Sequence, residues 1–201
     1  MATLAIQGEL FGFAQRLPQG LVYRPDFVAA DEEAALLAAI ETLPLEPAQY
    51  KEYTAKRRVT GFGSRYDYAT NDLVAAPPLP PFLHALRLRI AQWLRIPESR
   101  FVHALITEYR PGTPIGWHRD APQYDIVAGV SLLSSCRMKF RPYVRPHAQS
   151  SGGARRIATH EITLERRSAY LMTGESRNAY EHHIPAVGTL RYSITFRTVR
   201  A

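Results

Sequence analysis

The stretch "PIGWHRDAPQYDIVAGVSLL", residues 114–133, decides how the rest of the sequence is interpreted. A histidine and a carboxylate, His118 and Asp120, stand two residues apart just before a strand-like run at Ile126–Leu133. The strand period of two places both side chains on the same side. Because a lone His-x-Asp pair is common by chance, its meaning depends on the fold around it and on the residues that join it.

The surrounding sequence predicts one α+β domain. Two helices are expected first, at Ala30–Leu43 and within residues 80–98, with prolines near their ends. Runs rich in β-branched and aromatic residues then predict a block of strands. These strands are expected at Val102–Arg110, Ile126–Leu133, Arg137–Val144, Ile157–Leu164, Ala169–Met172 and Tyr192–Val199, with a short one near Tyr180. Helices followed by antiparallel strands indicate a sandwich or barrel covered by helices on one face.

Composition limits the class of protein. The 201 residues suit a single domain, and a net charge of +7 can attract phosphate backbones. The single cysteine, Cys136, excludes an internal disulfide and a Cys-rich zinc site, and it favours a reducing cytoplasm. No apolar run reaches the roughly 20 residues of a membrane span, and the N-terminus lacks the pattern of a secretory signal. No membrane partner is therefore expected.

Two segments lack clear periodicity. The stretch "KRRVTGFGSRYDYATND", residues 56–72, mixes arginines, glycines and aromatics and is interpreted as a surface loop or hairpin. The stretch "PHAQSSGGARR", residues 146–156, has the composition most typical of a flexible loop.

A second histidine completes a possible metal site. His182 in "YEHHIPAVG" follows His118 by 64 residues and lies in a different strand or loop. Two imidazoles and one carboxylate form the facial triad of non-haem Fe(II) oxygenases, which leaves three coordination positions open. The alternative is an ordinary polar turn with a surface histidine.

The last strand carries two arginines on one face. In "RYSITFR" the period of two groups Arg191, Ser193, Thr195 and Arg197. Arginines that point into a barrel are costly to bury unless they meet anions. A dicarboxylate such as 2-oxoglutarate would satisfy both guanidinium groups. An edge strand with solvated arginines is the alternative.

Several segments together are similar to one family. The stretches "LITEYRPGTPIGWHRD", "IVAGVSLL", "LMTGESRNAYEHHIP", "RYSITFR" and "RRVTGFGSRYDY" resemble the AlkB family of Fe(II)/2-oxoglutarate-dependent dioxygenases, over roughly residues 20–197. The resemblance implies a double-stranded β-helix (jelly-roll) core at about residues 102–200, with N-terminal helices and a nucleotide-recognition lid at about residues 50–72. Residues 1–19 would be an N-terminal extension. Fe(II), 2-oxoglutarate and O2 are the implied cofactors.

The family pattern assigns the metal ligands and the co-substrate contacts. It matches His118, Asp120 and His182 to the iron ligands, and its spacing before Ile-Pro selects His182 over His183. Arg191 and Arg197 match the 2-oxoglutarate anchors, Tyr109 matches a tyrosine that hydrogen-bonds the co-substrate, and Thr107 and Ser193 stand where the best-known members carry asparagine.

The substrate-binding assignments come from the lid segment. An aromatic side chain there would stack on the target base, and arginines would hold phosphates. The aromatic candidates are Tyr66, Tyr68 and Phe62, and the phosphate-binding candidates are Arg57, Arg58 and Arg65. The alternative is a packed hairpin whose aromatics only support the lid.

The resemblance implies oxidative dealkylation of N-alkylated bases in nucleic acid, with single-stranded DNA or RNA as the partner of a monomeric enzyme. One feature favours a different substrate. After Asp120 the stretch "APQYD" lacks the acidic residue that base-reading members carry, unless Asp125 replaces it. The same oxygenase chemistry on a protein side chain or a small molecule is therefore the alternative. A non-catalytic binding module that keeps the fold is a third possibility.

Overall fold

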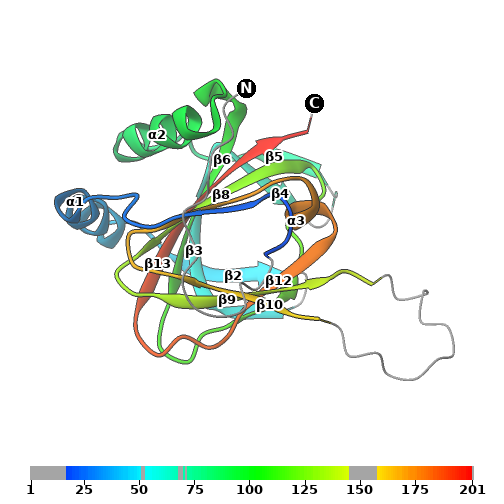
Figure 1. Ribbon diagram of the computed structural model, residues 1–201. Coiled ribbons are helices and arrows are strands. Elements are labelled where there is room, and N and C mark those ends of the chain that lie inside the picture. Colours follow the sequence, from blue (N-terminus) through cyan, green and yellow to red (C-terminus); the bar gives the residue numbers. More distant parts are fainter. Residues whose placement is uncertain (1–16, 51–52, 68–69, 71, 145–157, 201) are drawn as a thin grey trace, which may run out of the picture.

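Two facing antiparallel sheets form the body of this computed structural model, which describes residues 17–50, 53–67, 70, 72–144 and 158–200. The seven-stranded major sheet has the order β1-β11-β8-β13-β6-β3-β2, and the four-stranded minor sheet has the order β10-β9-β12-β7 (Figure 1). The major strands are β1 (Leu21–Arg24), β2 (Glu46–Tyr50), β3 (Tyr53–Phe62), β6 (Phe101–Tyr109), β8 (Tyr124–Leu132), β11 (Ala169–Met172) and β13 (Arg191–Val199). The minor strands are β7 (Ile115–His118), β9 (Cys136–Pro142), β10 (His160–Leu164) and β12 (Tyr180–Ile184).

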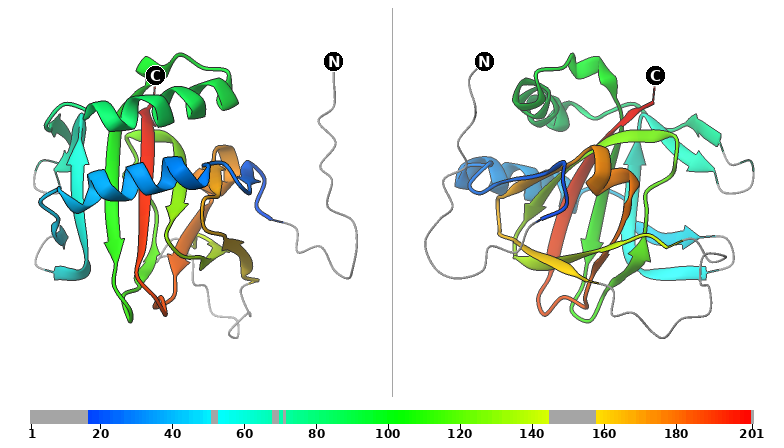
Figure 2. Two further views of the ribbon diagram at one scale, coloured as in Figure 1. Left: turned by 90° about the vertical axis from the view of Figure 1, so that its left-hand side faces the viewer. Right: turned by 45° about the vertical axis from the view of Figure 1, so that its right-hand side comes forward.

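Two helices cover the outer face of the major sheet. Helix α1 (Ala30–Glu41) crosses its strands, and α2 (His84–Leu94) lies beside α1 (Figure 2). Acidic residues in the first turn of α1 favour its positive end. The buried Glu33 accepts hydrogen bonds from Leu133 N and Arg166 Nε, both at 2.8 Å, and so ties α1 to the sheet. The short helical segments are η1 (Pro81–Leu83), η2 (Glu98–Arg100) and α3 (Gly174–Asn178).

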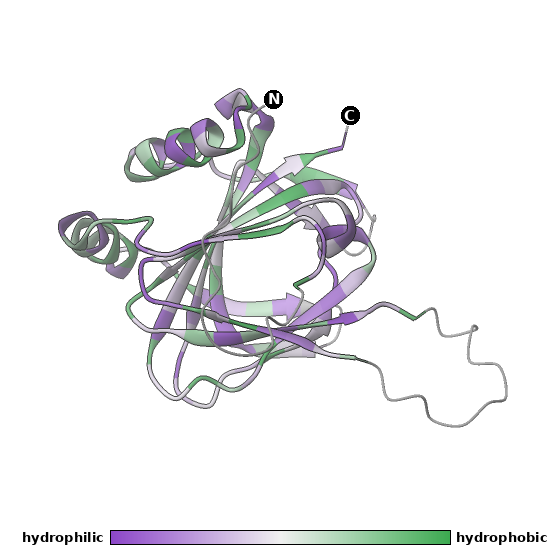
Figure 3. Ribbon diagram, in the orientation of Figure 1, coloured by the Kyte–Doolittle hydropathy of each residue, from purple (hydrophilic) through white to green (hydrophobic). Residues whose placement is uncertain are grey.

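The alternation of side chains along the major strands supplies two separate cores. In β13, Ile194 and Phe196 pack into the cluster under the helices, whereas Arg191 and Ser193 face the minor sheet. The cluster between the two sheets includes Phe140 of the minor sheet. Hydrophobic and hydrophilic residues alternate along many strands in Figure 3. The space between the sheets is therefore where polar side chains of both sheets can meet.

The structure corrects the prediction of a surface loop or hairpin at residues 56–72. Strand β3 pairs with β6 in the major sheet, with Val59 opposite Thr107, so much of the expected lid belongs to the core sheet. Only β4 (Ser64–Asp67) and β5 (Asp72–Ala75) form a separate hairpin. Gly63 begins it with a φ of 79°, which a residue with a Cβ rarely adopts. The period of two was hidden because polar residues lie on both faces of β3.

Both predicted helices and the predicted strands are confirmed, and the ends of the strands differ by three residues or fewer within the described chain. The strand predicted from residue 157 begins at His160, and residue 157 itself lies outside the described chain. Strands β1, β2 and β7 were not predicted, and His118 ends β7 rather than preceding a strand. The expected loop at residues 146–156 lies outside the described residues, and so do residues 1–16 of the expected extension. Within the described residues, no helix is both long and apolar enough to cross a membrane.

Candidate active site

The fold brings together the three residues predicted as metal ligands. His118 and His182 are direct partners in the pairing of β7 with β12, and their ring centroids lie 4.2 Å apart. Asp120 follows β7 in a bend, with Oδ2 3.7 Å from His182 Nε2. Among the described residues, no group of three His, Cys, Asp or Glu side chains is already closed into a metal centre. The three lie close together without yet converging on one point.

The protonation states of these side chains suit a metal. Burial lowers the pKa of His182 to about 3, and it also lowers the pKa of His118, so both imidazoles are neutral. His118 Nδ1–H donates to Gly116 O at 2.8 Å. The lone pair of Nε2 is therefore free to bind a metal. Burial alone would raise the pKa of Asp120, but Arg197 and the two histidines hold it well below its ordinary value. Two neutral imidazoles and a carboxylate are a donor set that fits Fe(II).

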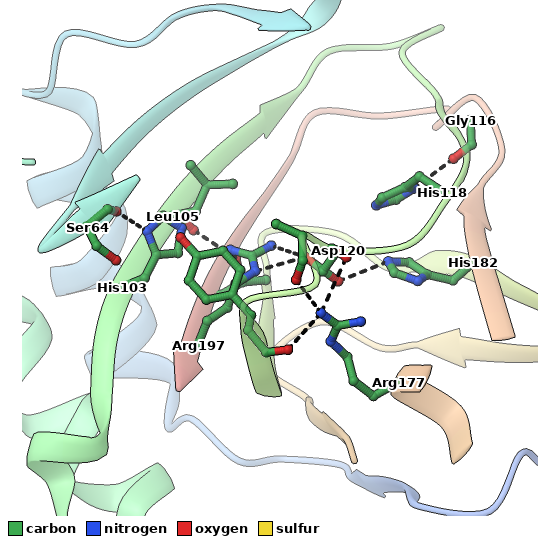
Figure 4. A network of polar contacts seen from close by, with 12 residues as sticks. Ser64, His103, Leu105, Gly116, His118, Asp120, Arg177, His182 and Arg197 are labelled. Atoms are coloured by element: carbon green, nitrogen blue, oxygen red, sulfur yellow. Dashed lines mark hydrogen bonds and ion pairs between the residues drawn. The ribbon is translucent and has the colours of Figure 1, made fainter. Parts of the chain in front are cut away.

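Arg197 holds the carboxylate of the metal set. Its Nε and Nη2 both donate to Asp120 Oδ1, at 2.8 and 2.7 Å, and its Nη1 donates to Thr195 Oγ1 at 3.1 Å. The guanidinium also lies over the ring of Tyr124. Figure 4 shows Arg197 beside Asp120, with His182 on the other side of the carboxylate. Because its three nitrogens all have protein partners, Arg197 orients Asp120, with Oδ2 turned to His182. Its predicted role as a 2-oxoglutarate anchor stays a prediction.

Arg191 is buried with part of its hydrogen-bonding capacity unused. It is 1% exposed, and its Nε donates to Ser131 Oγ at 3.0 Å. Its Nη1 is buried and has no hydrogen-bond partner among the described residues. The guanidinium lies over the ring of Tyr109, its cross-strand neighbour, and Ser193 and Thr107 form the next pair on the same face of these strands. A buried guanidinium nitrogen without a partner is costly, so this site fits the carboxylate of a small acid.

A cavity of about 470 Å³ between the sheets connects these groups. The predicted metal ligands and co-substrate residues all line it, and so do Arg57, Arg65 and Tyr66 of the predicted substrate set. Two other members of that set do not line the cavity. Phe62 packs into the core under the helices, and Arg58 turns to Glu108, 3.3 Å away. Alternate residues of β3 face opposite sides, so Arg57 faces the cavity and these two do not. Tyr68 lies outside the described residues.

Two residues that sequence reasoning did not assign to the site support it. Arg177 of α3 donates from Nη2 to the carbonyl oxygens of Asp120, Ala121 and Tyr124, at 3.3, 2.6 and 2.9 Å. It thereby holds the bend that carries Asp120, and its place in "GESRN" was the only signal. His103, which is buried, lines the cavity and donates from Nδ1 to Ser64 O of the β4–β5 hairpin (Figure 4).

His183, the rival of His182, lies on the other face of β12. Its Nδ1–H donates to Ile115 O at 2.7 Å, and its ring packs on Trp117 with centroids 5.1 Å apart. It does not line the cavity. Asp125 is likewise absent from the lining, so it does not replace the missing acidic residue at the cavity wall.

Comparison with known protein families shows a match to the 2OG-Fe(II) oxygenase superfamily over residues 20–197. The chain therefore belongs to the 2OG-Fe(II) oxygenase superfamily, which implies Fe(II), 2-oxoglutarate and O2 as cofactors. An alkylated DNA repair protein ALKBH8 homolog of Arabidopsis thaliana is 30% identical, over 83% of this chain and 51% of that protein. The tRNA (carboxymethyluridine(34)-5-O)-methyltransferase ALKBH8 of Macaca fascicularis is 30% identical, over 85% of this chain and 25% of that protein.

These relatives confirm the resemblance to the AlkB family, although the chain spans only about half and a quarter of their lengths. Solved structures confirm the double-stranded β-helix. OsALKBH1 has a TM-score of 0.67 at 15% identity, over 92% of this chain and 99% of that one. A prolyl-4-hydroxylase of Pseudomonas putida has a TM-score of 0.57 at 16% identity, over 90% of this chain and 93% of that one.

The geometry gives each part of the site a chemical task. Iron and 2-oxoglutarate supply the oxidising chemistry when they are bound with O2. His118, Asp120 and His182 would hold the metal on one face, and Arg197 keeps the carboxylate ionised and oriented. Arg191 would receive a carboxylate of the co-substrate. The side chains of His182, Asp120 and Arg197 are buried between the sheets, which strengthens the electrostatic interactions among them.

Proposed function

We propose that this protein oxidatively dealkylates N-alkylated bases in nucleic acid, with Fe(II) held by His118, Asp120 and His182. The observation that carries the proposal is the lining of the cavity. Arg57, Arg65 and Tyr66 of β3 and β4 line the same cavity as the metal ligands. An aromatic ring and two guanidinium groups beside a metal site suit a nucleotide taken out of its stack.

Charge and relatives support a nucleic-acid substrate. The chain carries 25 basic and 18 acidic residues, and such a surplus favours phosphate backbones. Its relatives bear names that refer to alkylated DNA repair and to tRNA. Those names describe longer proteins, so both DNA and RNA are candidate substrates here. We further propose a cytoplasmic monomer, because the only cysteine is buried and unpaired.

The second candidate is the same oxygenase chemistry on a protein side chain or a small molecule. One observation favours it. Among the described residues, Asp120 is the one acidic side chain that lines the cavity, so no base-reading carboxylate is found at this part of its wall. The two candidates predict different substrates for one metal site.

The test uses protein loaded with Fe(II) under anaerobic conditions and then given 2-oxoglutarate and O2. Single-stranded oligonucleotides with N1-methyladenine or N3-methylcytosine, bulk tRNA, and a peptide mixture are offered separately. Mass spectrometry follows the mass of each substrate, and Asp120→Ala is the inactive control. Loss of methyl groups from an oligonucleotide or from a nucleoside of the tRNA supports the proposal. Oxidation of the peptides alone would contradict it in favour of the second candidate.

A further inference from the structure

Tyr170 lies in the wall of the cavity in a way that only a glycine opposite it permits. Tyr170 of β11 is paired with Gly129 of β8, and it is 6% exposed. Its ring lies across the glycine. A Cβ added at residue 129 would collide with Cε1 and Cζ of Tyr170 and would stand 2.5 Å from its hydroxyl oxygen. The ring therefore occupies the volume in which a side chain of residue 129 would lie.

The hydroxyl of Tyr170 ends in the middle of the proposed co-substrate site. Gly129 pairs on its other side with Thr195, which lies between Arg191 and Arg197 on the inward face of β13. Burial raises the pKa of Tyr170, Asp120 raises it further, and Arg191 and Arg197 act in the opposite direction. The phenol is thus neutral and lies within electrostatic reach of both ends of the site.

The Tyr170 hydroxyl can form a hydrogen bond with a ligand. No hydrogen bond is seen between this hydroxyl and a described residue, and Tyr170 lines the cavity. Its O–H is therefore available to a ligand there. Tyr170 lines the same cavity as the metal ligands and Arg191, the groups between which a 2-oxo diacid would lie.

We infer that Tyr170 contacts 2-oxoglutarate and limits the length of the acid that the site accepts. The inference rests on the proposed placement of the co-substrate between the metal ligands and Arg191. In that placement the phenol donates a hydrogen bond to the acid, and its ring leaves no room for a longer chain. Gly129 acts as a positioning residue, because its missing side chain lets the ring lie flat.

The test measures binding of 2-oxoglutarate and of 2-oxoadipate, which is one methylene longer, by calorimetry with Mn(II) in place of Fe(II). Tyr170→Phe removes only the hydroxyl, and the Kd for 2-oxoglutarate is expected to rise about tenfold, the effect of one lost hydrogen bond. Tyr170→Leu opens the site, and the preference should shift toward 2-oxoadipate by about tenfold or more. Tyr23→Phe is the matched control, because the Tyr23 hydroxyl bonds Glu165 N outside the cavity.

A pair of compensating substitutions, at Gly129 and Tyr170, distinguishes the proposed role of Tyr170 from damage to the fold. Gly129→Ala should push the ring into the site and weaken 2-oxoglutarate binding. Adding Tyr170→Leu should restore much of that binding, because the new methyl group then has space. Thermal unfolding of each variant shows whether it is folded. A double variant that binds no better than Gly129→Ala alone, although folded, would count against the inference.

Arg191→Met tests the placement on which the inference rests. One outcome is that Arg191→Met loses 2-oxoglutarate binding while both Tyr170 variants keep wild-type Kd values for the two acids. That result would overturn the role of Tyr170 and leave the placement of the co-substrate intact. Wild-type binding in Arg191→Met would overturn the placement of the co-substrate and this inference with it.

Discussion

Asp120 connects the metal set to the arginine behind it. One carboxylate oxygen meets His182, and the other receives two hydrogen bonds from Arg197. Asp120→Ala removes a ligand and leaves a buried guanidinium without its anion, which typically destabilises a fold by about 3–5 kcal/mol. We expect Mn(II) affinity to fall by more than about a hundredfold, since outer-shell changes alone cost about 10–100-fold. Calorimetric titration of the folded variant measures this.

Asp125→Ala is the matched control for that experiment. Asp125 lies five residues further along the chain and does not line the cavity. It should keep wild-type Mn(II) affinity and wild-type 2-oxoglutarate turnover. Equal metal affinity in Asp120→Ala and Asp125→Ala would show that the metal ligands have been misassigned.

His103 makes the stability of the metal-free protein depend on pH. Burial, helped by Arg197, lowers its pKa from 6.5 to about 3. Between about pH 3 and 6.5 the unfolded chain binds a proton at His103 that the folded chain does not. The free energy of unfolding therefore falls as pH falls through this range, and the contribution of His103 is fully present above pH 6.5. Each such proton contributes at most about 1.4 kcal/mol per pH unit.

His103→Gln removes one of these protons. Urea unfolding with a chelator present, at several pH values between 4 and 8, should give a shallower loss of stability toward acid than in the wild type. His118 and His182 also have lowered pKa values and keep part of the slope in the variant. An unchanged slope would mean that His103 is protonated in the folded protein.

At the residue scale, sequence reasoning found the side chains that a spacing pattern marks. His118, Asp120 and His182 were identifiable because imidazoles and a carboxylate carry their chemistry in their residue type. Arg177 and Tyr170 were not. Arg177 acts through three backbone carbonyls, and Tyr170 depends on a glycine in another strand. Such contacts exist only once the strands are aligned.

The β4–β5 hairpin is the element that we expect to recognise nucleic acid. It carries Arg65 and Tyr66 at the cavity wall, and His103 holds it through Ser64 O. Arg65→Ala should raise the KM for a methylated oligonucleotide about tenfold, because one charge-assisted hydrogen bond to phosphate is lost. The slow 2-oxoglutarate turnover without nucleic acid should not change. Steady-state succinate assays measure both.

Arg100→Ala controls for the loss of positive charge. Arg100 is exposed in η2, which packs against α2 away from the cavity. Its loss lowers the net charge by the same amount and should leave the KM nearly unchanged. Equal rises of KM in Arg65→Ala and Arg100→Ala would point to general attraction rather than to contact at the hairpin.

At the element scale, prediction was successful where one face of an element is clearly apolar. Helix α2 and strand β8 follow their patterns closely. Strand β3 was mistaken for a loop because its cavity face carries Arg57 and its other face carries Arg58, so neither face looks apolar. Strand β7 has only four residues, which is too short for its period to be seen.

The whole molecule carries a positive charge that should make nucleic-acid binding depend on salt. Each phosphate contact to a single strand contributes a slope of about −0.7 in log K against log salt. If Arg57 and Arg65 each contact one phosphate, the expected slope is about −1.4. Fluorescence anisotropy with a labelled oligonucleotide between 50 mM and 300 mM salt, roughly the range where screening changes most, measures it. Binding that does not respond to salt would favour the second candidate substrate class.

The most direct measurement is the ratio of succinate formed to methyl groups lost in one reaction with a methylated single-stranded oligonucleotide. We predict that the two rise together at a ratio near one, and that both disappear in Asp120→Ala. Succinate in the wild type with no loss of methyl groups from any nucleic acid would contradict the proposed reaction. Methyl loss that persists in Asp120→Ala would contradict the proposed metal site.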